Sequence, residues 1–221
     1  MQQNRQPIDP IFKRNFGIKT PIVYLQDLEL PQIEKEHFNR SWKKFYKKAK
    51  SPLSDSRLSR FEAFFRQLEK DGSDERYSRR IEIRFIDHLV GYGVFAKEPI
   101  PPYSTLCHYT GVFKLDHEID PDHDSTFSFT EYKTYSIDAA EKGNWARFMN
   151  HAGEKESVNN AIPWEYYHEK GPRIVFTSGP RGIKRGAQIL YSYGDEYWEQ
   201  KESICLLDES QKVRSYKRKI S

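Results

Sequence analysis

The chain has 221 residues, of which 37% are hydrophobic, 14% aromatic and 31% charged, so it is long enough for one substantial domain with a smaller region attached. It contains no apolar run near the ~18 residues that a membrane span needs, and its first residues lack the apolar segment of a secretory signal peptide, which excludes an integral membrane protein and predicts a soluble one. Its two cysteines, Cys107 and Cys205, are too few for a metal cluster, and we expect both to be reduced thiols.

The net charge of +4 conceals an asymmetry between the two parts of the chain. Residues 1–80 carry 18 Lys and Arg against 11 Asp and Glu, a net charge of +7. Residues 81–221 carry 18 against 21, a net charge of −3. A basic region joined to a mildly acidic body indicates two different electrostatic tasks.

The basic region predicts two helices that form a hairpin. Residues 1–20 are polar and predict an irregular arm, and residues 22–25 predict a short extended segment. A first helix is expected from Pro31 until Pro52, with apolar residues at helical spacing on one face: Phe38, Trp42, Phe45, Tyr46 and Ala49. A second helix is expected over about residues 56–70, with Gly72 at its end and these residues inward: Leu58, Phe61, Phe65 and Leu68.

A cluster of lysines lies mostly opposite the aromatic face of the first predicted helix: Lys43, Lys44, Lys47, Lys48 and Lys50. A solvated helix surface accounts for this cluster. A nonspecific nucleic-acid contact also accounts for it, because clustered lysines release counterions condensed on phosphates. No base-reading motif accompanies the lysines, so sequence-specific binding is not expected.

From residue 81 onward the pattern changes to short strands separated by turns, which predicts a mainly β body with a helical appendage. The expected strands are residues 81–86, 93–96, 105–109, 134–137, 174–177 and 188–193. Residues 195–207 predict an amphipathic helix, because their larger apolar residues follow i, i+3, i+4 spacing. A basic tail follows.

Three motifs in this body combine glycines, apolar residues and polar side chains that both donate and accept hydrogen bonds, as a small polar-ligand site requires. Read alone, each motif could be structural: turn glycines, a satisfied core histidine or a capped tyrosine. The motifs are Gly91-Tyr92-Gly93 with Tyr109-Thr110-Gly111, then Gly143-Asn144 with Arg147-Phe148-Met149-Asn150-His151, then residues 183–190 with Tyr193-Gly194.

Together and in this order, the three motifs resemble the SET-domain protein lysine methyltransferases, over roughly residues 81–200. The resemblance implies a SET-type β fold with a knot-like C-terminal threading that joins the Asn-His and Tyr-Gly motifs. It divides the chain into a basic helical region at 1–80, a catalytic domain at 81–200, and a helix end with a basic tail at 201–221. Many relatives carry zinc-binding cysteine clusters that this chain lacks, so no metal is expected, and the 195–207 helix is expected to take their place.

The resemblance also implies the cofactor S-adenosylmethionine and a set of site residues. Tyr193 is the expected catalytic residue. The expected cofactor-binding residues are Gly91, Tyr92, Gly93, Arg147, Phe148, Asn150, His151, Tyr197 and Trp198. The expected substrate lysine channel consists of Tyr109, Phe127, Tyr191 and Tyr193. Asp138, which matches a structural aspartate of the family, is not expected to be a general base.

Substrate and product expectations follow from the same resemblance. Acidic residues alternate after the Tyr109-Thr110-Gly111 motif, at Asp116, Glu118, Asp120, Asp122 and Asp124, and this region borders the peptide groove in the family. They are expected to favour a basic protein such as a histone or histone-like protein, although a solvated loop would carry the same residues. A tyrosine at Tyr191 is expected to limit the product to mono- or dimethyl-lysine.

The small size and the lack of cysteine modules are similar to bacterial SET proteins, including the chlamydial kind. This predicts a protein of the bacterial cytoplasm or, if it is a secreted effector acting on chromatin, of the host nucleus. No membrane partner is expected, and the chain could form a homodimer. The alternative function is a noncatalytic SET module that binds basic peptides or nucleic acid.

Overall fold

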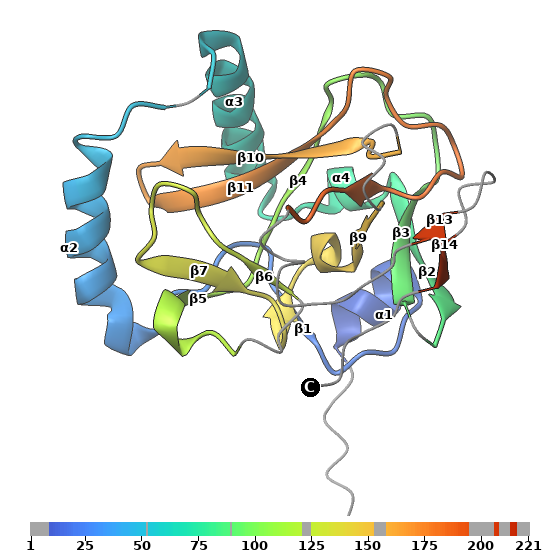
Figure 1. The fold of residues 1–221 in the computed structure, drawn as a ribbon, viewed down its shortest axis with the longest axis horizontal. Coiled ribbons are helices and arrows are strands. Elements are labelled where there is room, and N and C mark those ends of the chain that lie inside the picture. The colour runs from blue at the N-terminus through green and yellow to red at the C-terminus, as the bar shows by residue number, and fades with distance from the viewer. Residues whose placement is uncertain are drawn as a thin grey trace, which may run out of the picture. The chain divides into compact units, whose positions relative to one another are not determined.

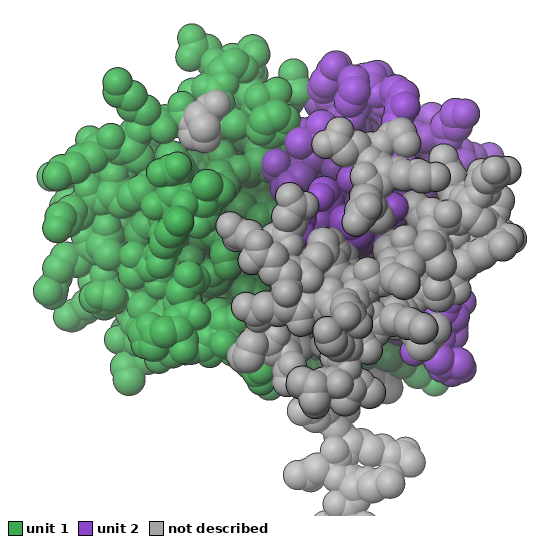
Figure 2. Space-filling view, in the orientation of Figure 1, with its two compact units in different colours: residues 1–76, 107–147, 164–175 green, residues 77–106, 148–163, 176–221 purple. Residues whose placement is uncertain are grey.

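The computed structural model describes residues 9–51, 53–88, 90–120, 125–152 and 158–194, together with 206–207 and 213–215. Within these ranges the structure has short strands, four α-helices and three 3-10 turns (Figure 1). The chain divides into two compact units, coloured green and purple in Figure 2. Unit 1 consists of residues 1–76, 107–147 and 164–175, and unit 2 of residues 77–106, 148–163 and 176–221. The predicted division at residues 80 and 200 stays a prediction.

The N-terminal segment contains a helix where an irregular arm was expected. Helix α1 spans Pro10–Phe16, and the Asp9 carboxylate caps it by accepting hydrogen bonds from two backbone N–H groups at 2.8 and 3.1 Å. Gly17 ends it in the left-handed conformation, at φ 70°. Phe12 is fully buried, with its ring 4.9 Å from the Tyr24 ring. The prediction was wrong because a seven-residue helix with one fully inward residue shows no helical periodicity.

The two predicted helices of the basic region are present in unit 1. The first begins as the 3-10 turn η1 (Gln32–Glu34) and continues as α2 (Lys35–Tyr46). The second is α3 (Asp55–Asp71), and Gly72 ends it at φ 63° as expected. A single turn, α4 (Glu75–Ser78), follows.

Both helices present aromatic faces to strands of unit 1. Phe38 of α2 packs on Phe113 with ring centroids 4.8 Å apart. Phe61 and Phe65 of α3 lie 5.7 and 5.4 Å from the ring of Tyr166. Aromatic pairs at these separations add to the free energy gained by burying their area, so the helices and strands of unit 1 share one core.

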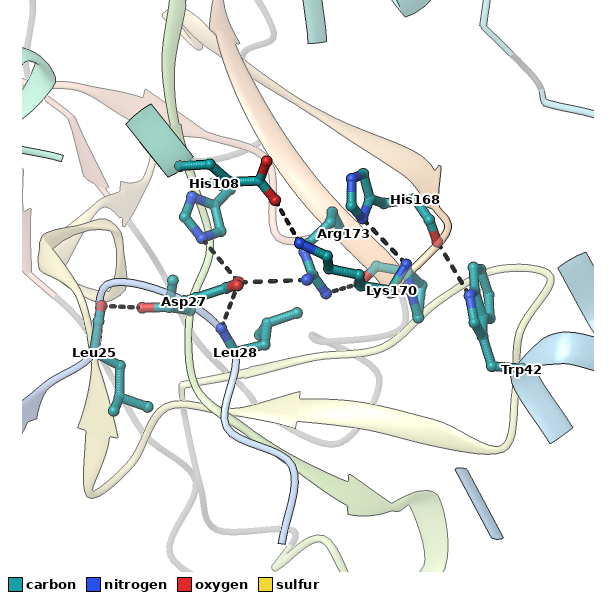
Figure 3. A network of polar contacts seen from close by, with 11 residues as sticks. Leu25, Asp27, Leu28, Trp42, His108, His168, Lys170 and Arg173 are labelled. Atoms are coloured by element: carbon teal, nitrogen blue, oxygen red, sulfur yellow. Dashed lines mark hydrogen bonds and ion pairs between the residues drawn. The ribbon is translucent and has the colours of Figure 1, made fainter. Parts of the chain in front are cut away.

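A polar network joins the segment after β1 (Val23–Tyr24) to strands β4 (Thr105–His108) and β11 (Gly171–Ser178), through residues that all belong to unit 1 (Figure 3). The Asp27 carboxylate lies 3.4 Å from Nη2 of Arg173 and 3.6 Å from Nε2 of His108. Burial alone would raise the pKa of Asp27, but the His108 and Arg173 side chains outweigh burial and hold that pKa well below its usual range. The Arg173 side chain is only 5% exposed, so Asp27 offsets a guanidinium that is otherwise costly to bury.

Unit 1 contains a three-stranded antiparallel sheet and a parallel pair. The sheet has the order β5 (Val112–Leu115), β7 (Tyr135–Asp138), β6 (Thr126–Phe127). The pair joins β1 (Val23–Tyr24) to β8 (Lys142–Gly143). The 3-10 turns η2 (Asp116–Glu118) and η3 (Trp145–Phe148) follow β5 and β8. A further sheet has the order β10 (Ala161–His168), β11 (Gly171–Ser178), β4 (Thr105–His108).

Unit 2 contains three two-stranded pairs. Strand β2 (Ile81–Asp87) pairs antiparallel with β3 (Gly91–Ala96), and β9 (Asn150–His151) pairs parallel with β12 (Leu190–Tyr191). Strand β13 (Leu206–Leu207) pairs antiparallel with β14 (Val213–Ser215). The β-rich architecture agrees with the predicted fold class.

Strands β5, β6, β8, β9 and β10 were not among the predicted strands, and the helix predicted over 195–207 also needs correction. The sequence did not predict β10, because Pro163 interrupts its apolar pattern; proline is tolerated there since β10 is the edge strand of its sheet. The helix predicted over 195–207 ends in residues that belong to β13, while residues 195–205 lie outside the described residues.

No helix within the described ranges is long and apolar enough to cross a membrane. Cys107 is a buried free thiol, and Cys205 lies outside the described residues. The pKa of the Cys107 thiol is raised by burial, so it is an inert packing residue rather than a nucleophile.

Candidate active site

The Asn-His and Tyr-Gly motifs meet in unit 2 through the parallel pairing of β9 with β12. Leu190 is in register with Asn150, and Tyr191 with His151. Asn160 fixes the incoming segment with its side chain: its Nδ2 donates to the Gln188 carbonyl at 2.8 Å, and its Oδ1 accepts from the Leu190 N–H at 3.0 Å. The two motifs are therefore held side by side although about 40 residues separate them in the chain.

Tyr193 lies just beyond β12 and is anchored at both ends. Its hydroxyl donates to the Met149 carbonyl at 2.9 Å. Its backbone N–H donates to Nδ1 of His151 at 3.1 Å. Because Nδ1 of His151 accepts, its ring is the neutral tautomer with a proton on Nε2. The imidazole, which is 5% exposed, thus serves to position Tyr193.

Tyr191 belongs to β12 and is 8% exposed. Its ring lies 4.8 Å from the Phe176 ring and 4.8 Å from the Tyr193 ring, measured between centroids. The two tyrosines, which are separated by Ser192, form an aromatic pair in unit 2. Their place in a lysine channel stays a prediction.

The Gly91-Tyr92-Gly93 motif forms the beginning of β3, beside Asn150. Nδ2 of Asn150 donates to the Tyr92 carbonyl at 3.1 Å. The Phe148 ring packs edge-on against the Tyr92 ring at 5.8 Å. Gly91 is in the left-handed region at φ 75°, which favours glycine.

Gly93 is required by close approach. A Cβ at this position would lie 2.8 Å from Nε2 of Gln188 and 3.2 Å from Nδ2 of Asn150. Two amide nitrogens therefore flank the α-carbon of Gly93, and only a residue without a side chain leaves room for them.

Gln188 is a residue that the sequence analysis did not assign to the site. It is 8% exposed, and its Nε2 is buried without a hydrogen-bond partner among the described residues. A buried donor of this kind is costly unless something accepts from it. The sequence signal that could have assigned Gln188 to the site was its position in the third motif, two residues after Gly186.

Three predicted site residues belong to unit 1. Tyr109 and Phe127 lie together with ring centroids 5.6 Å apart, and the Tyr109 hydroxyl donates to the Ser125 carbonyl at 2.8 Å. Nε of Arg147 donates to the Ala139 carbonyl at 2.6 Å, and its Nη2 donates to Oγ of Ser125 at 3.0 Å. These bonds hold the Arg147 guanidinium against the segment after β7, and its predicted part in cofactor binding stays a prediction. Tyr197 and Trp198 lie outside the described residues.

Asp138 also has a structural environment. It is 3% exposed, its Oδ2 lies 2.6 Å from Nζ of Lys114, and its Oδ1 accepts from the Ala140 N–H at 2.8 Å. A carboxylate held by a lysine and a backbone amide is poorly placed to act as a general base. In the described part of the chain no group of His, Cys, Asp or Glu side chains could hold a metal ion.

Comparison with known families gives a match to the SET domain over residues 91–194, the segment that contains all of these motifs. Residues 91–194 form a SET domain. Among curated proteins the chain is similar to the histone-lysine N-methyltransferase EHMT1 of Homo sapiens, with 33% identity over 119 residues. It is also similar to the histone-lysine N-methyltransferase EZH2 of Chaetomium thermophilum, with 31% identity over 120 residues.

The similarity covers only part of each protein. It spans 52% of this chain but 9% of human EHMT1, and 48% of this chain but 8% of the fungal EZH2. Among solved structures, ATXR5 in complex with mono-methylated histone H3.1 superposes with a TM-score of 0.58 and 21% identity. That match covers 79% of this chain and 81% of ATXR5, and at this identity it supports the SET fold alone.

Proposed function

We propose that this protein is a protein lysine N-methyltransferase that uses S-adenosylmethionine. The observation that carries the proposal is the double anchoring of Tyr193 in the SET domain. The Tyr193 hydroxyl donates its proton to the Met149 carbonyl, so toward a substrate amine its oxygen would act as a hydrogen-bond acceptor. The Tyr193 side chain is already held in place beside the Tyr191 ring. It can therefore orient an amine without losing further conformational entropy.

The residues around Gly93 fit the proposed cofactor. The Gln188 amide nitrogen is a buried donor without a protein acceptor, and it lies beside the Asn150 amide. A ligand oxygen such as that of an amino-acid carboxylate would satisfy such a donor. We infer that Gly91, Tyr92, Gly93, Phe148, Asn150 and His151 hold S-adenosylmethionine, with Tyr197 and Trp198 covering its adenine. When bound, the cofactor supplies an electrophilic methyl group on a sulfonium.

The protein must deliver a lysine in its uncharged form, because only the neutral amine has the lone pair that accepts a methyl group. A free lysine has a pKa of about 10.4, and a desolvated aromatic channel lowers it. We propose that Tyr191 and Tyr193, with Tyr109 and Phe127, line this channel. Exclusion of water and alignment of the amine are then the main contributions of the chain.

The proposed substrate is a basic protein such as a histone or a histone-like protein. In support, the similar curated proteins are histone-lysine methyltransferases, and the ATXR5 structures contain histone H3. Asp116, Glu118 and Asp120 add an acidic segment next to β5. The bacterial origin, the role as an effector on chromatin, the compartment and a homodimer rest on the sequence resemblance alone.

The proposal is tested by incubating the protein with S-adenosylmethionine labelled in its methyl group and a panel of histones and small basic bacterial proteins. We expect label on lysines of at least one basic protein, mapped by mass spectrometry, and much less label with Tyr193→Phe. Binding of basic peptides without transfer to any lysine would instead support the noncatalytic SET module.

A further inference from the structure

An open groove in unit 1 runs between the end of α2 and the loop that leads into β7. Its volume is about 760 Å³, and its lining includes Lys44, Lys48, Lys50, Lys133, Phe45 and Tyr132. We call it the α2 groove. All of its lining residues belong to unit 1, and none belongs to the candidate active site.

The charge of the α2 groove is strongly one-sided. Four lysines line it, and Glu131 is its single acidic residue. Each of the four lysines is exposed, and none forms an ion pair within the described part of the chain. Elsewhere in the chain, Lys114, Lys142 and Lys170 each have a carboxylate partner within 2.6 Å. The groove therefore presents unneutralised positive charge.

An exposed helix surface does not account for this arrangement. Lys44 lies in the last turn of α2, where the helix dipole favours a cation. Lys48 and Lys50 lie beyond the end of the helix, and like charges at Lys44 and Lys48, four residues apart, repel each other. Lys133 comes from a segment more than 80 residues later in the chain and lines the same groove. The fold itself gathers these charges.

The groove wall between the lysines is rigid. The Phe45 ring lies 5.2 Å from the Tyr132 ring and 5.3 Å from the Tyr167 ring. The Tyr132 hydroxyl is 2.7 Å from Oγ of Ser41, and Tyr132 and Tyr167 are 3% and 8% exposed. Because these tyrosines are buried, they cannot stack on bases. They fix the spacing of the lysines on either side of them instead.

From these observations we propose that the α2 groove binds the phosphate backbone of nucleic acid without reading its sequence. Lysine ammonium groups are point charges that suit repeated phosphates, and each phosphate that they neutralise releases condensed counterions. An acidic peptide has a lower charge density and gains less from counterion release. Buried tyrosines and the lack of arginine in the groove leave no means of reading bases.

The test measures binding of the full chain to a fluorescent 20-base-pair DNA duplex over a range of salt concentrations. The groove variant carries Lys44→Gln, Lys48→Gln, Lys50→Gln and Lys133→Gln. The control variant loses the same charge at exposed lysines outside the groove, through Lys13→Gln, Lys19→Gln, Lys70→Gln and Lys97→Gln. Melting temperatures of both variants establish that they are folded.

We expect the groove variant to lose at least tenfold in duplex affinity at low salt and the control variant to lose much less. The slope of log K against log salt should fall by about 3 to 4 in the groove variant, since each phosphate contact contributes about 0.9. Two duplexes of unrelated sequence should bind equally. Lys133→Glu alone should also weaken binding of the duplex, because it reverses the charge of the one groove lysine that comes from a segment distant from α2 in the chain.

Equal losses in the groove and control variants would overturn the proposal. A poly-glutamate peptide that binds as tightly as the duplex, with the same dependence on the groove lysines, would overturn it in favour of an acidic protein partner. Methylation of a short free peptide should be the same in the groove variant and the wild type. The binding test therefore fails or succeeds separately from the proposed enzyme activity.

Discussion

The Tyr193 hydroxyl donates a hydrogen bond to the Met149 carbonyl across 2.9 Å, joining two residues that lie 44 positions apart in the chain. This bond sets the direction of the phenol, while His151 holds the backbone of the same residue. The proton of Tyr193 is thus directed toward the Met149 carbonyl. We propose that a tyrosine held in this way orients the substrate amine as an acceptor rather than as an acid.

Replacing Tyr193 with phenylalanine should preserve the fold and reduce methyl transfer by at least tenfold, equivalent to about 1.4 kcal/mol of barrier. The substitution removes only the oxygen that would orient the substrate amine. The turnover number with a basic peptide and cofactor affinity by calorimetry should be measured together. Tyr103→Phe, at a residue that is 50% exposed, is the matched control. It should keep the wild-type turnover number and the wild-type affinity for the cofactor. Unchanged turnover in Tyr193→Phe would remove Tyr193 from the catalytic role.

Changes around Gly93 should affect cofactor binding rather than the rate of the bound complex. Asn150→Ala should weaken binding of S-adenosylmethionine, because it removes one of two amides beside Gly93 together with its hydrogen bond to the Tyr92 carbonyl. Gly93→Ala should do so as well, since its Cβ would lie 2.6 to 3.2 Å from three side-chain atoms. Gly179→Ala is the control, because its Cβ would meet nothing closer than 3.6 Å. Wild-type affinity in both site variants would contradict the proposed cofactor site.

The site motifs were predictable from sequence because their residue types and order are specific, and the pairing of β9 with β12 agrees with the predicted meeting of the Asn-His and Tyr-Gly motifs. The contacts of single atoms were not predictable. In the sequence, Gln188 cannot be told from any other polar strand residue. Only the structure shows that its side-chain nitrogen is buried beside Gly93. Arg147 was predicted to bind the cofactor, but the sequence did not show that its guanidinium donates to the Ala139 and Ala140 carbonyls and to Oγ of Ser125.

Helix α1 and strand β10, which sequence reasoning missed, share a physical cause. Helix α1 is too short to show a period of 3.6 residues, so only Asp9-Pro10 at its start and Gly17 after it signal a helix in the sequence. Strand β10 contains Pro163, which reads as a strand breaker unless the strand is known to lie at an edge. Periodicity detects long elements with one buried face, and both of these depend on tertiary position.

Acidic residues next to β5 should raise the affinity for basic peptides. Asp116 accepts a hydrogen bond from the Ser136 hydroxyl, so it is left unchanged, and the test variant is Glu118→Gln with Asp120→Asn. We expect a higher Michaelis constant for a lysine peptide flanked by arginines, with a smaller effect at high salt, because the Debye length is only about 8 Å at physiological ionic strength. A peptide with neutral flanks is the control. If the constants for both peptides stay at the wild-type values, the segment does not steer substrate.

The Asp27 network should make the free energy of unfolding depend on pH in the acidic range. The pKa of Asp27 is lower in the folded protein than in the unfolded chain, where it is about 3.9. Ionised Asp27 therefore stabilises the fold above about pH 4, and this contribution is lost as the pH falls through the lower folded-state pKa. Asp27→Asn should be less stable than wild type in urea at pH 7, with a smaller difference at pH 3. A difference that does not shrink in acid would show that charge is not the cause.

Tyr191 should limit the number of methyl groups added to one lysine. The Tyr191 ring lies 4.8 Å from the Tyr193 ring, so its hydroxyl can hold a water molecule near the amine that Tyr193 orients. That water occupies the space that an added methyl would need, and it hinders rotation of a methylated amine into line. Phe127, the fourth residue of the predicted channel, has no hydroxyl, which leaves fewer groups to hold such a water.

Tyr191→Phe should therefore shift the product from mono- or dimethyl-lysine towards trimethyl-lysine on the same residue, with little loss of the first transfer. Mass spectrometry of a peptide substrate after long incubation measures this distribution. Phe127→Tyr offers the opposite change and should favour the monomethyl product, because it adds a hydroxyl beside Tyr109. If the wild-type protein already accumulates trimethyl-lysine, the Tyr191 hydroxyl holds no water that restricts the channel, and the product limit must come from elsewhere.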